Sequence, residues 1–407
     1  MAFLVRLLLL ERKDRPLAQI PPMRNLKPMR PIALSTILTF LLLGCGDSGT
    51  PGLSGTAGAG GTAGSGGGGG GSLITTLSHR YDPQMLERGE ETSDVCQSWV
   101  LGNDEPLYVT KVRQTNEGGW HHSNWFFVPE AAYPPNEAEE GPDAQLEGSW
   151  RCRDRGFREY LAAAAGGVFF AQSTQALDEL QAFPKGSALE IPPRSVIVGS
   201  THLLNITAGP LETAMTMEVE AVPADEVQVR LTPFSFAIGD LAIPPAVDGV
   251  PTRSRTSMMC DLTESFQQHL GEDTVDYNVY YVLGHYHQWG SAFNLSFVQE
   301  DGSMETIFDI KNKIGEPIGS IIDPPMNNRG APRLRSECGF INNTDETLRR
   351  GLQYGEMCDF LAYTDANLKI GASGINNQAM GVDEDGVAVF ETDCGPITGF
   401  RAYRDEL

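Results

Sequence analysis

Seven histidines occur among the 407 residues, and five of them lie in three short contexts. These are the adjacent pair His121 and His122, the single His202, and the pair His285 and His287, which flanks one tyrosine. Side chains two apart on a strand point to the same face, so the His-x-His pair can bind one metal ion. Neighbours on a regular strand face opposite ways, so the adjacent pair needs a bulge or a strand end. The pattern predicts metal ligation; the alternative is a set of solvated surface histidines.

A methionine supplies a sixth candidate ligand. Met357 stands in the segment Tyr-Gly-Glu-Met-Cys-Asp-Phe-Leu-Ala-Tyr, residues 354–363. Imidazoles suit both oxidation states of copper, and a thioether favours Cu(I) over zinc and hard cations. Met357 therefore indicates copper. The alternative is a core methionine beside a disulfide, which would leave His285 and His287 without an obvious third ligand.

The order of these residues resembles that of the type II, ascorbate-dependent copper monooxygenases, which include dopamine beta-monooxygenase and peptidylglycine alpha-hydroxylating monooxygenase. The resemblance runs from about residue 94 to residue 394. It implies two copper ions, each in its own antiparallel β-sandwich domain, facing each other across a solvent-filled cleft. The implied ligands are His121, His122 and His202 for the first copper, and His285, His287 and Met357 for the second.

The activity that the resemblance implies is hydroxylation of a C–H bond in a small organic substrate. The second copper site, with His285, His287 and Met357 as its catalytic residues, would bind dioxygen. The first would take electrons one at a time from ascorbate or another small reductant. Two other functions also agree with the sequence: a non-enzymatic copper-binding cell-surface protein of the same fold, and an adhesive relative that has lost activity.

Positions near the second ligand set bear on the substrate. Where the peptide-amidating members hold a terminal carboxylate with Arg and Tyr, this chain has Leu283 and Leu361, and Asp359 replaces their Asn. A buried carboxylate needs a charged or hydrogen-bonding partner. We therefore expect a neutral or apolar substrate, or an amine if Asp359 faces the pocket, rather than a peptide ending in glycine. A carboxylate-binding arginine could still come from elsewhere, and the nearest candidates in sequence are Arg333, Arg335 and Arg349.

The cysteines indicate disulfides in an exported chain. If Cys45 carries a lipid, six cysteines remain, and an even number outside the cytosol favours disulfides. Spacing alone leaves fifteen pairings open. The resemblance implies the pairs Cys96–Cys152, Cys260–Cys394 and Cys338–Cys358.

The pattern of the first 45 residues predicts an export signal that ends in a lipobox. Basic residues precede the apolar run Ile32–Leu43, which is too short to cross a bilayer as a helix. The run ends in Leu-Leu-Gly-Cys, so we expect a bacterial cell-envelope protein that is lipid-anchored at Cys45. The alternative is an ordinary signal peptide. Residues 46–76 are rich in Gly, Ser and Ala and predict a flexible linker.

Beyond the linker, apolar residues alternate with polar ones, which predicts an all-β fold of two consecutive antiparallel, jelly-roll-like β-sandwiches. The alternation is clearest in Met215–Ala221 and Phe293–Phe297. We also expect strands at 195–198 and 277–283. Only Phe157–Ala165 and Thr174–Gln181 have helical character.

The domain boundary is expected near Asp225, giving an N-terminal copper domain over 77–225 and a C-terminal one over 226–407. The strand Glu226–Leu231 could close the first sheet or open the second.

The charge balance restricts the partners. The chain has 30 Lys and Arg residues against 53 Asp and Glu residues, a formal net charge of -23. Such a surface repels phosphate backbones and anionic membranes. We expect a small-molecule substrate, dioxygen and a reductant as partners, no nucleic acid, and membrane attachment only through the lipid.

Overall fold

The structure is a computed structural model, and it describes residues 74–132, 147–172, 175–311, 316–351 and 355–402. The predicted signal region 1–45, Cys45 itself and most of the predicted linker 46–76 lie outside these residues. The first strand, β1 (Thr75–Arg80), begins two residues before the predicted domain start at 77. No helix of the described residues is long and apolar enough to span a membrane.

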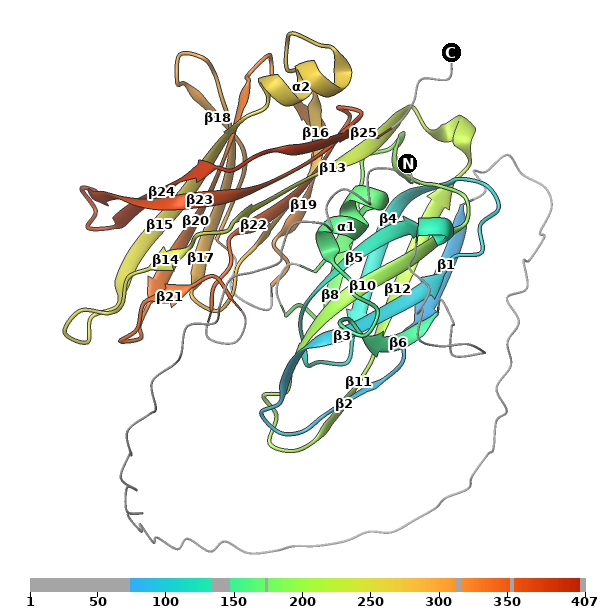
Figure 1. Ribbon diagram of the computed structural model, residues 1–407, viewed down its shortest axis with the longest axis horizontal. Helices are drawn as coiled ribbons and strands as arrows, with labels where there is room; N and C mark the ends of the chain where they lie inside the picture. The colour runs from blue at the N-terminus through green and yellow to red at the C-terminus, as the bar shows by residue number, and fades with distance from the viewer. Residues whose placement is uncertain (1–73, 133–146, 173–174, 312–315, 352–354, 403–407) are drawn as a thin grey trace, which may run out of the picture. The chain divides into compact units, whose positions relative to one another are not determined.

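Strands dominate the first half of the described chain (Figure 1). After β1 they are β2 (Gln84–Leu86), β3 (Glu91–Val100), β4 (Leu107–Asn116), β5 (Trp120–Pro129), β6 (Gly148–Arg151), β7 (Gly167–Ala171), β8 (Asp178–Ala182), β9 (Ser187–Ile191), β10 (Ser195–Leu204), β11 (Leu211–Thr213) and β12 (Met215–Val222). The helical segments are η1 (Glu130–Ala132), α1 (Glu159–Ala165) and η2 (Ala224–Glu226).

The second half is built in the same way. Its strands are β13 (Val229–Ile238), β14 (Ala242–Ile243), β15 (Thr252–Asp261), β16 (Asn278–His285), β17 (Gly290–Val298), β18 (Met304–Ile310), β19 (Gly319–Asn327), β20 (Arg333–Asn342), β21 (Leu348–Arg349), β22 (Asp359–Thr364), β23 (Leu368–Val382), β24 (Ala388–Cys394) and β25 (Thr398–Arg401). Its described helix is α2 (Thr263–Leu270). The all-β prediction is confirmed.

Two hydrophobic cores form. The first contains side chains of the sheet β6-β3-β10-β5-β7 together with those of β1, β12, β4 and β9. From the second half it also includes Tyr280, Tyr281 and Leu283 of β16 and Leu361 and Tyr363 of β22. The second gathers side chains of strands β13 to β23 and of helix α2. Alternation creates these cores: in β12, Met215, Met217 and Val219 are buried while Glu218 between them is exposed.

The predicted boundary falls beside a strand that serves both halves. Residues 229–231 of β13 pair in parallel with β9, whereas residues 232–237 pair with β22 and residues 234–238 with β23. The sequence left open to which sheet this segment belongs. The strand belongs to both, and it extends to Ile238 rather than ending at Leu231.

The two predicted helices have different outcomes. Phe157–Ala165 is confirmed as α1, which begins two residues later, at Glu159. Thr174–Gln181 is wrong as a helix, because Asp178–Ala182 forms the edge strand β8 against β4. Glu179 there is 1% exposed and Leu180 48% exposed, which inverts the usual alternation and hides the strand period from a hydrophobic pattern.

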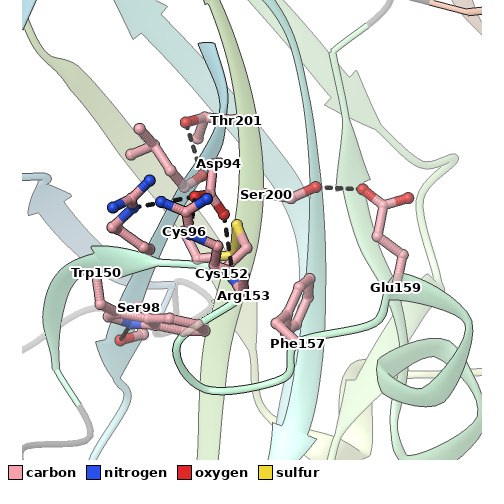
Figure 2. Close-up of a disulfide and its surroundings, with 12 residues drawn as sticks. Asp94, Cys96, Ser98, Trp150, Cys152, Arg153, Phe157, Glu159, Ser200 and Thr201 are labelled. Carbon is pink, nitrogen blue, oxygen red and sulfur yellow. Dashed lines mark hydrogen bonds and ion pairs between the residues drawn. A yellow bond between two sulfur atoms is a disulfide. The ribbon is translucent and has the colours of Figure 1, made fainter. Parts of the chain in front are cut away.

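All three implied disulfides are present. Cys96–Cys152, Cys260–Cys394 and Cys338–Cys358 have Cα–Cα distances of 5.0, 5.2 and 5.9 Å. Around the first, Asp94 accepts hydrogen bonds from the Arg151 side chain and the Arg153 backbone N–H, each at 3.1 Å (Figure 2). Disulfides persist in oxidising compartments outside the cytosol, so the protein is an exported one.

Candidate metal centre

The adjacent histidines lie at a β-bulge, as their spacing requires. His122 on β5 pairs with His202 on β10, and Trp120 pairs with Leu203, which leaves His121 as the extra residue of the bulge. The chain enters β5 through Gly119, whose φ is 73° and where a Cβ would lie 2.8 Å from a leucine side chain. The bulge lets both imidazoles join one cluster, their ring centroids 5.5 Å apart.

His202 joins this pair from the neighbouring strand. Its Nδ1 lies 3.0 Å from Nε2 of His122, and its Nε2 contacts the carboxylate of Glu91 on β3. A carboxylate on one imidazole nitrogen orients the ring so that the other nitrogen faces a ligand. Two imidazole nitrogens bound to one ion at about 2 Å each are roughly 3 Å apart, so the facing pair suits a shared metal.

The His-x-His pair comes from the end of a strand. His285 is the last residue of β16, and His287 follows in the turn, with ring centroids 5.2 Å apart. Nδ1 of His287 lies 3.0 Å from the carbonyl oxygen of Gly355. A carbonyl only accepts, so Nδ1 carries the proton and Nε2 keeps its lone pair. That Nε2 is buried and has no hydrogen-bond partner among the described residues, which is the state a metal ligand needs.

The two predicted ligand sets lie together in the structure. Ring centroids are 4.8 Å apart between His121 and His287, and 4.8 Å apart between His122 and His285. Ligand atoms of His121, His122 and His287 all lie within 4.8 Å of one another. The solvent-filled cleft that the resemblance implied does not separate the two sets, because histidines of β5, β10 and the end of β16 form one cluster.

The electrostatics of this cluster favour neutral rings. Burial, reinforced by the neighbouring imidazoles, lowers the pKa of His121 to about 2. The same causes lower the pKa of His287 to about 3, although the Gly355 carbonyl opposes the shift, and they lower the pKa of His122 well below its usual value. Neutral imidazole is the form that binds metal.

Met357 lies just before β22 and lines a cavity of about 410 Å³ together with His122, His202 and His285. The disulfide Cys338–Cys358 fixes the residue that follows it to β20. The candidate thioether ligand and three of the candidate imidazoles therefore border one space.

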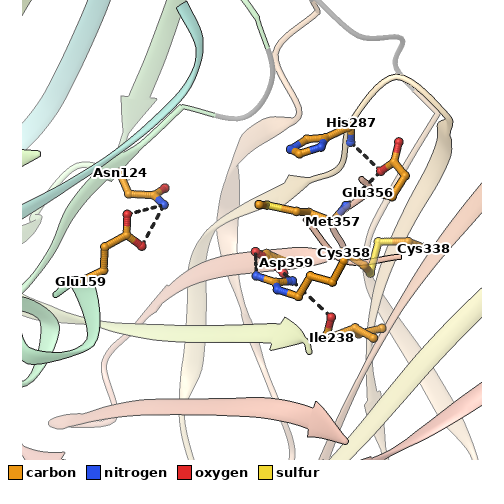
Figure 3. Close-up of polar contacts among 10 residues, drawn as sticks. Asn124, Glu159, Ile238, His287, Cys338, Glu356, Met357, Cys358 and Asp359 are labelled. Carbon is orange, nitrogen blue, oxygen red and sulfur yellow. Dashed lines mark hydrogen bonds and ion pairs between the residues drawn. A yellow bond between two sulfur atoms is a disulfide. The ribbon is translucent and has the colours of Figure 1, made fainter. Parts of the chain in front are cut away.

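Glu356 organises the second ligand set, and the sequence reasoning missed it. Its carboxylate accepts backbone N–H groups of His287 at 2.8 Å, Trp289 at 2.7 Å and Met357 at 3.1 Å (Figure 3). Burial raises the pKa of Glu356 to about 7, while these N–H groups oppose the rise. In the sequence, the position of Glu356 directly before Met357 is the signal that could have identified it. The contact of its carboxylate with the turn at His287 depends on the tertiary fold and cannot be predicted from that position.

A half-buried carboxyl group, that of Glu159, lines the cavity. Glu159 on α1 accepts hydrogen bonds from the Asn124 amide, at 3.2 and 3.3 Å, and from the Ser200 hydroxyl (Figures 2 and 3). Burial raises the pKa of Glu159, and these two donors oppose the rise. Both oxygens are already engaged, so Glu159 is a fixed polar feature of this wall.

The remaining charges of the cavity form one ion pair. Arg350 binds Asp359 through two parallel hydrogen bonds of 2.6 and 2.8 Å, and both residues line the cavity. Arg350 was not among the predicted candidates. None of Arg333, Arg335 and Arg349, all of which are described, is among the lining residues.

Comparisons with known proteins identify no family. No protein-family model matches the chain, and no curated protein matches it. Among solved structures, PNGase F, a glycosylasparaginase from Flavobacterium meningosepticum, is similar over 80% of this chain and 99% of its own, with 8% identity and a TM-score of 0.31. The major capsid protein of bacteriophage PM2 covers 70% of this chain and 97% of its own, with 8% identity and a TM-score of 0.27. Likenesses this distant carry no conclusion about the chain.

We expect Glu356→Gln to weaken the binding of copper added to this candidate centre about 10- to 100-fold, since an outer-shell partner that orients ligands contributes on that scale. The glutamine amide would turn donors toward backbone N–H groups that need acceptors. Chelator competition measures the copper affinity, and circular dichroism checks the fold. Glu346→Gln, at an exposed position, is the matched control. Unchanged affinity in Glu356→Gln would show that the carboxylate is structural only.

Proposed function

We propose that this protein is a dicopper monooxygenase that hydroxylates a C–H bond of a small organic substrate with dioxygen and ascorbate or a similar one-electron reductant. The observation that carries the proposal is the cluster of five buried imidazoles, three of them bordering, with Met357, a cavity of substrate size. The proposed ligands are those predicted from sequence: His121, His122 and His202, then His285, His287 and Met357. In the structure His287 also lies within reach of the same ion as His121 and His122, so the two proposed copper ions would be close neighbours.

The donor set fits copper. Five imidazoles and one thioether include no carboxylate, which disfavours hard cations, and the thioether supports Cu(I). His287 already has the required tautomer. Nδ1 of His121 accepts an N–H of the Gln175 amide at 2.7 Å, which places the ring proton on Nε2, so a metal at Nε2 requires the amide to present its oxygen to Nδ1 instead. Copper, when bound, would supply one-electron chemistry with dioxygen.

The proposed reaction balances with the named reductant. The substrate C–H bond becomes C–OH, and the second oxygen atom leaves as water. This requires two electrons and two protons in addition to dioxygen, and two molecules of ascorbate can supply the electrons singly. The chain's own part is to orient the ligands and hold the substrate: Glu356 fixes the turn of His287, and apolar residues such as Phe126 and Leu361 line the cavity.

A copper-binding surface protein without activity is the alternative. Metal storage requires ligands but no adjoining space for an organic molecule. The cavity of about 410 Å³ at the candidate ligands therefore favours catalysis.

The purified mature chain should bind two copper ions and consume oxygen only when reductant and substrate are present.

We expect His121→Ala to abolish ascorbate-driven turnover while retaining copper at the other ligands. Met357→Leu should retain part of the copper and lose hydroxylation, because His285 and His287 remain. Metal analysis and an oxygen electrode make the measurements, with His269→Ala on α2 as the control. Preferential zinc binding, or full turnover by His121→Ala, would refute the proposal.

The substrate we propose is uncharged at its reacting end. Asp359 does line the cavity, but it is paired with Arg350, so the arginine is not available to a carboxylate. The leucines Leu283 and Leu361 add apolar surface to the same cavity.

Asp359→Asn should release Arg350 and raise kcat/KM for an acylated glycine at least about tenfold, because a charge-assisted pair with a carboxylate becomes possible. The parent should turn over a phenethylamine in preference to the acylated glycine. The double variant Arg350→Gln/Asp359→Asn controls for the loss of the aspartate and should not show the gain. Efficient turnover of the acylated glycine by the parent would refute the proposal that the cavity does not bind a carboxylate. The copper proposal would be unaffected.

We also propose that the exported chain is lipid-anchored through Cys45, which stands at the end of the apolar run in the sequence. Cys45→Ser should move the protein from the membrane fraction to the soluble fraction on cell fractionation. A parent protein found wholly in the soluble fraction would exclude the anchor.

A further inference from the structure

The cavity of about 410 Å³ that Met357 lines together with His122, His202 and His285 is called the metal-side cavity. A second cavity, of about 360 Å³, adjoins it. It is lined by residues of α1, β7, β13, β23 and β25 and by the loop before β25. The two cavities have four lining residues in common: Tyr160, Ala163, Val168 and Ser235. This second cavity, which we call the Lys369 cavity, takes no part in the proposed copper chemistry.

Lys369 on β23 is the one charged residue among the described residues that line this cavity. Its Nζ donates a hydrogen bond to the carbonyl oxygen of Gly166 and lies 5.6 Å from the centre of the Phe127 ring. Burial lowers the pKa of Lys369 to about 8, and no described carboxylate counteracts the shift. A half-buried cation is therefore present without an acidic partner among the described residues.

Capping of α1 explains only part of this arrangement. Gly166 follows the last helical residue, and a cation at a helix C-terminus is favourable. An ammonium group carries three N–H donors, and the carbonyl uses one of them. A fully exposed lysine would cap the carbonyl without losing any hydration, so the partial burial of Lys369 favours a second partner for its other N–H donors.

The opening of the Lys369 cavity is aromatic and apolar. Tyr160 is 70% exposed and Phe400 is 48% exposed, although both are large apolar-bodied side chains. Val168, Pro233 and Ile370 line the same space. Exposed aromatic residues around an apolar concavity are typical of a ligand-binding site.

We propose that the Lys369 cavity binds an organic monocarboxylate, whose carboxylate pairs with Lys369 and whose apolar body packs against Tyr160 and Phe400. One compact cation matches one negative charge, and the described lining holds no second cation for the further charge of a phosphate ester. The apolar walls favour a hydrocarbon or aryl body over a sugar. This binding does not require copper, so it stands apart from the proposed oxidation.

The test compares 4-phenylbutyrate with its neutral isostere 4-phenylbutanamide by isothermal titration calorimetry on the full mature protein, with and without copper. We expect the carboxylate to bind at least about tenfold more tightly than the amide, since one charge-assisted hydrogen bond distinguishes them. Lys369→Met should abolish this preference and Lys369→Arg should retain it. Lys111→Met, which removes an exposed lysine paired with Glu220, is the matched control.

Equal affinity for the two compounds, no binding of either, or an unchanged preference in Lys369→Met would overturn the proposal. If Lys369→Met does not fold, acetylation of the parent protein replaces it. Mass spectrometry should then show that 4-phenylbutyrate protects Lys369 from acetic anhydride at least about fivefold at pH 8, since a paired amine is a poor nucleophile. The amide should not protect, and absence of protection by the carboxylate would equally overturn the proposal. Copper content and oxygen consumption report separately on the proposed function.

Discussion

Neutral imidazoles packed against one another away from water are the constraint on which the rest of this structure depends. His121, His122 and His287 approach closely enough for one metal ion, and a proton on any of them would place a charge in a buried site beside other imidazoles. Their lowered pKa values express that penalty. A fold that holds such a cluster needs strong restraints on several separate strands, because the rings gain little from one another without a metal.

The restraints are of three kinds. The β-bulge at His121 turns two adjacent side chains into one cluster, which a regular strand does not allow. The disulfide Cys338–Cys358 fixes the segment beside Met357, and the buried carboxylate of Glu356 ties that segment to the turn of His287. Covalent and hydrogen-bonded supports thus act on the same short segment. Precise ligand placement depends on such supports.

Charge is distributed differently in the two neighbouring cavities. In the metal-side cavity, Arg350 and Asp359 neutralise each other, and the oxygens of Glu159 are engaged by Asn124 and Ser200. That space offers a substrate apolar surface and compensated polar groups. In the adjoining cavity, Lys369 has a carbonyl and a ring as described neighbours, which is why an external anion is proposed there and not beside Met357.

The sequence by itself determined the all-β class, the strands with clear alternation such as Met215–Ala221, and the types of the candidate ligands. It also determined that joint ligation by His121 and His122 needed a bulge or a strand end, since side-chain direction within one strand follows from spacing alone. The disulfide pairs followed from the resemblance and not from spacing. Only the tertiary structure decided that both histidine sets meet in one cluster, that Thr174–Gln181 contains an edge strand, and that Arg350 pairs with Asp359. Those outcomes depend on register and on contacts between strands far apart in the chain, which local residue patterns do not encode.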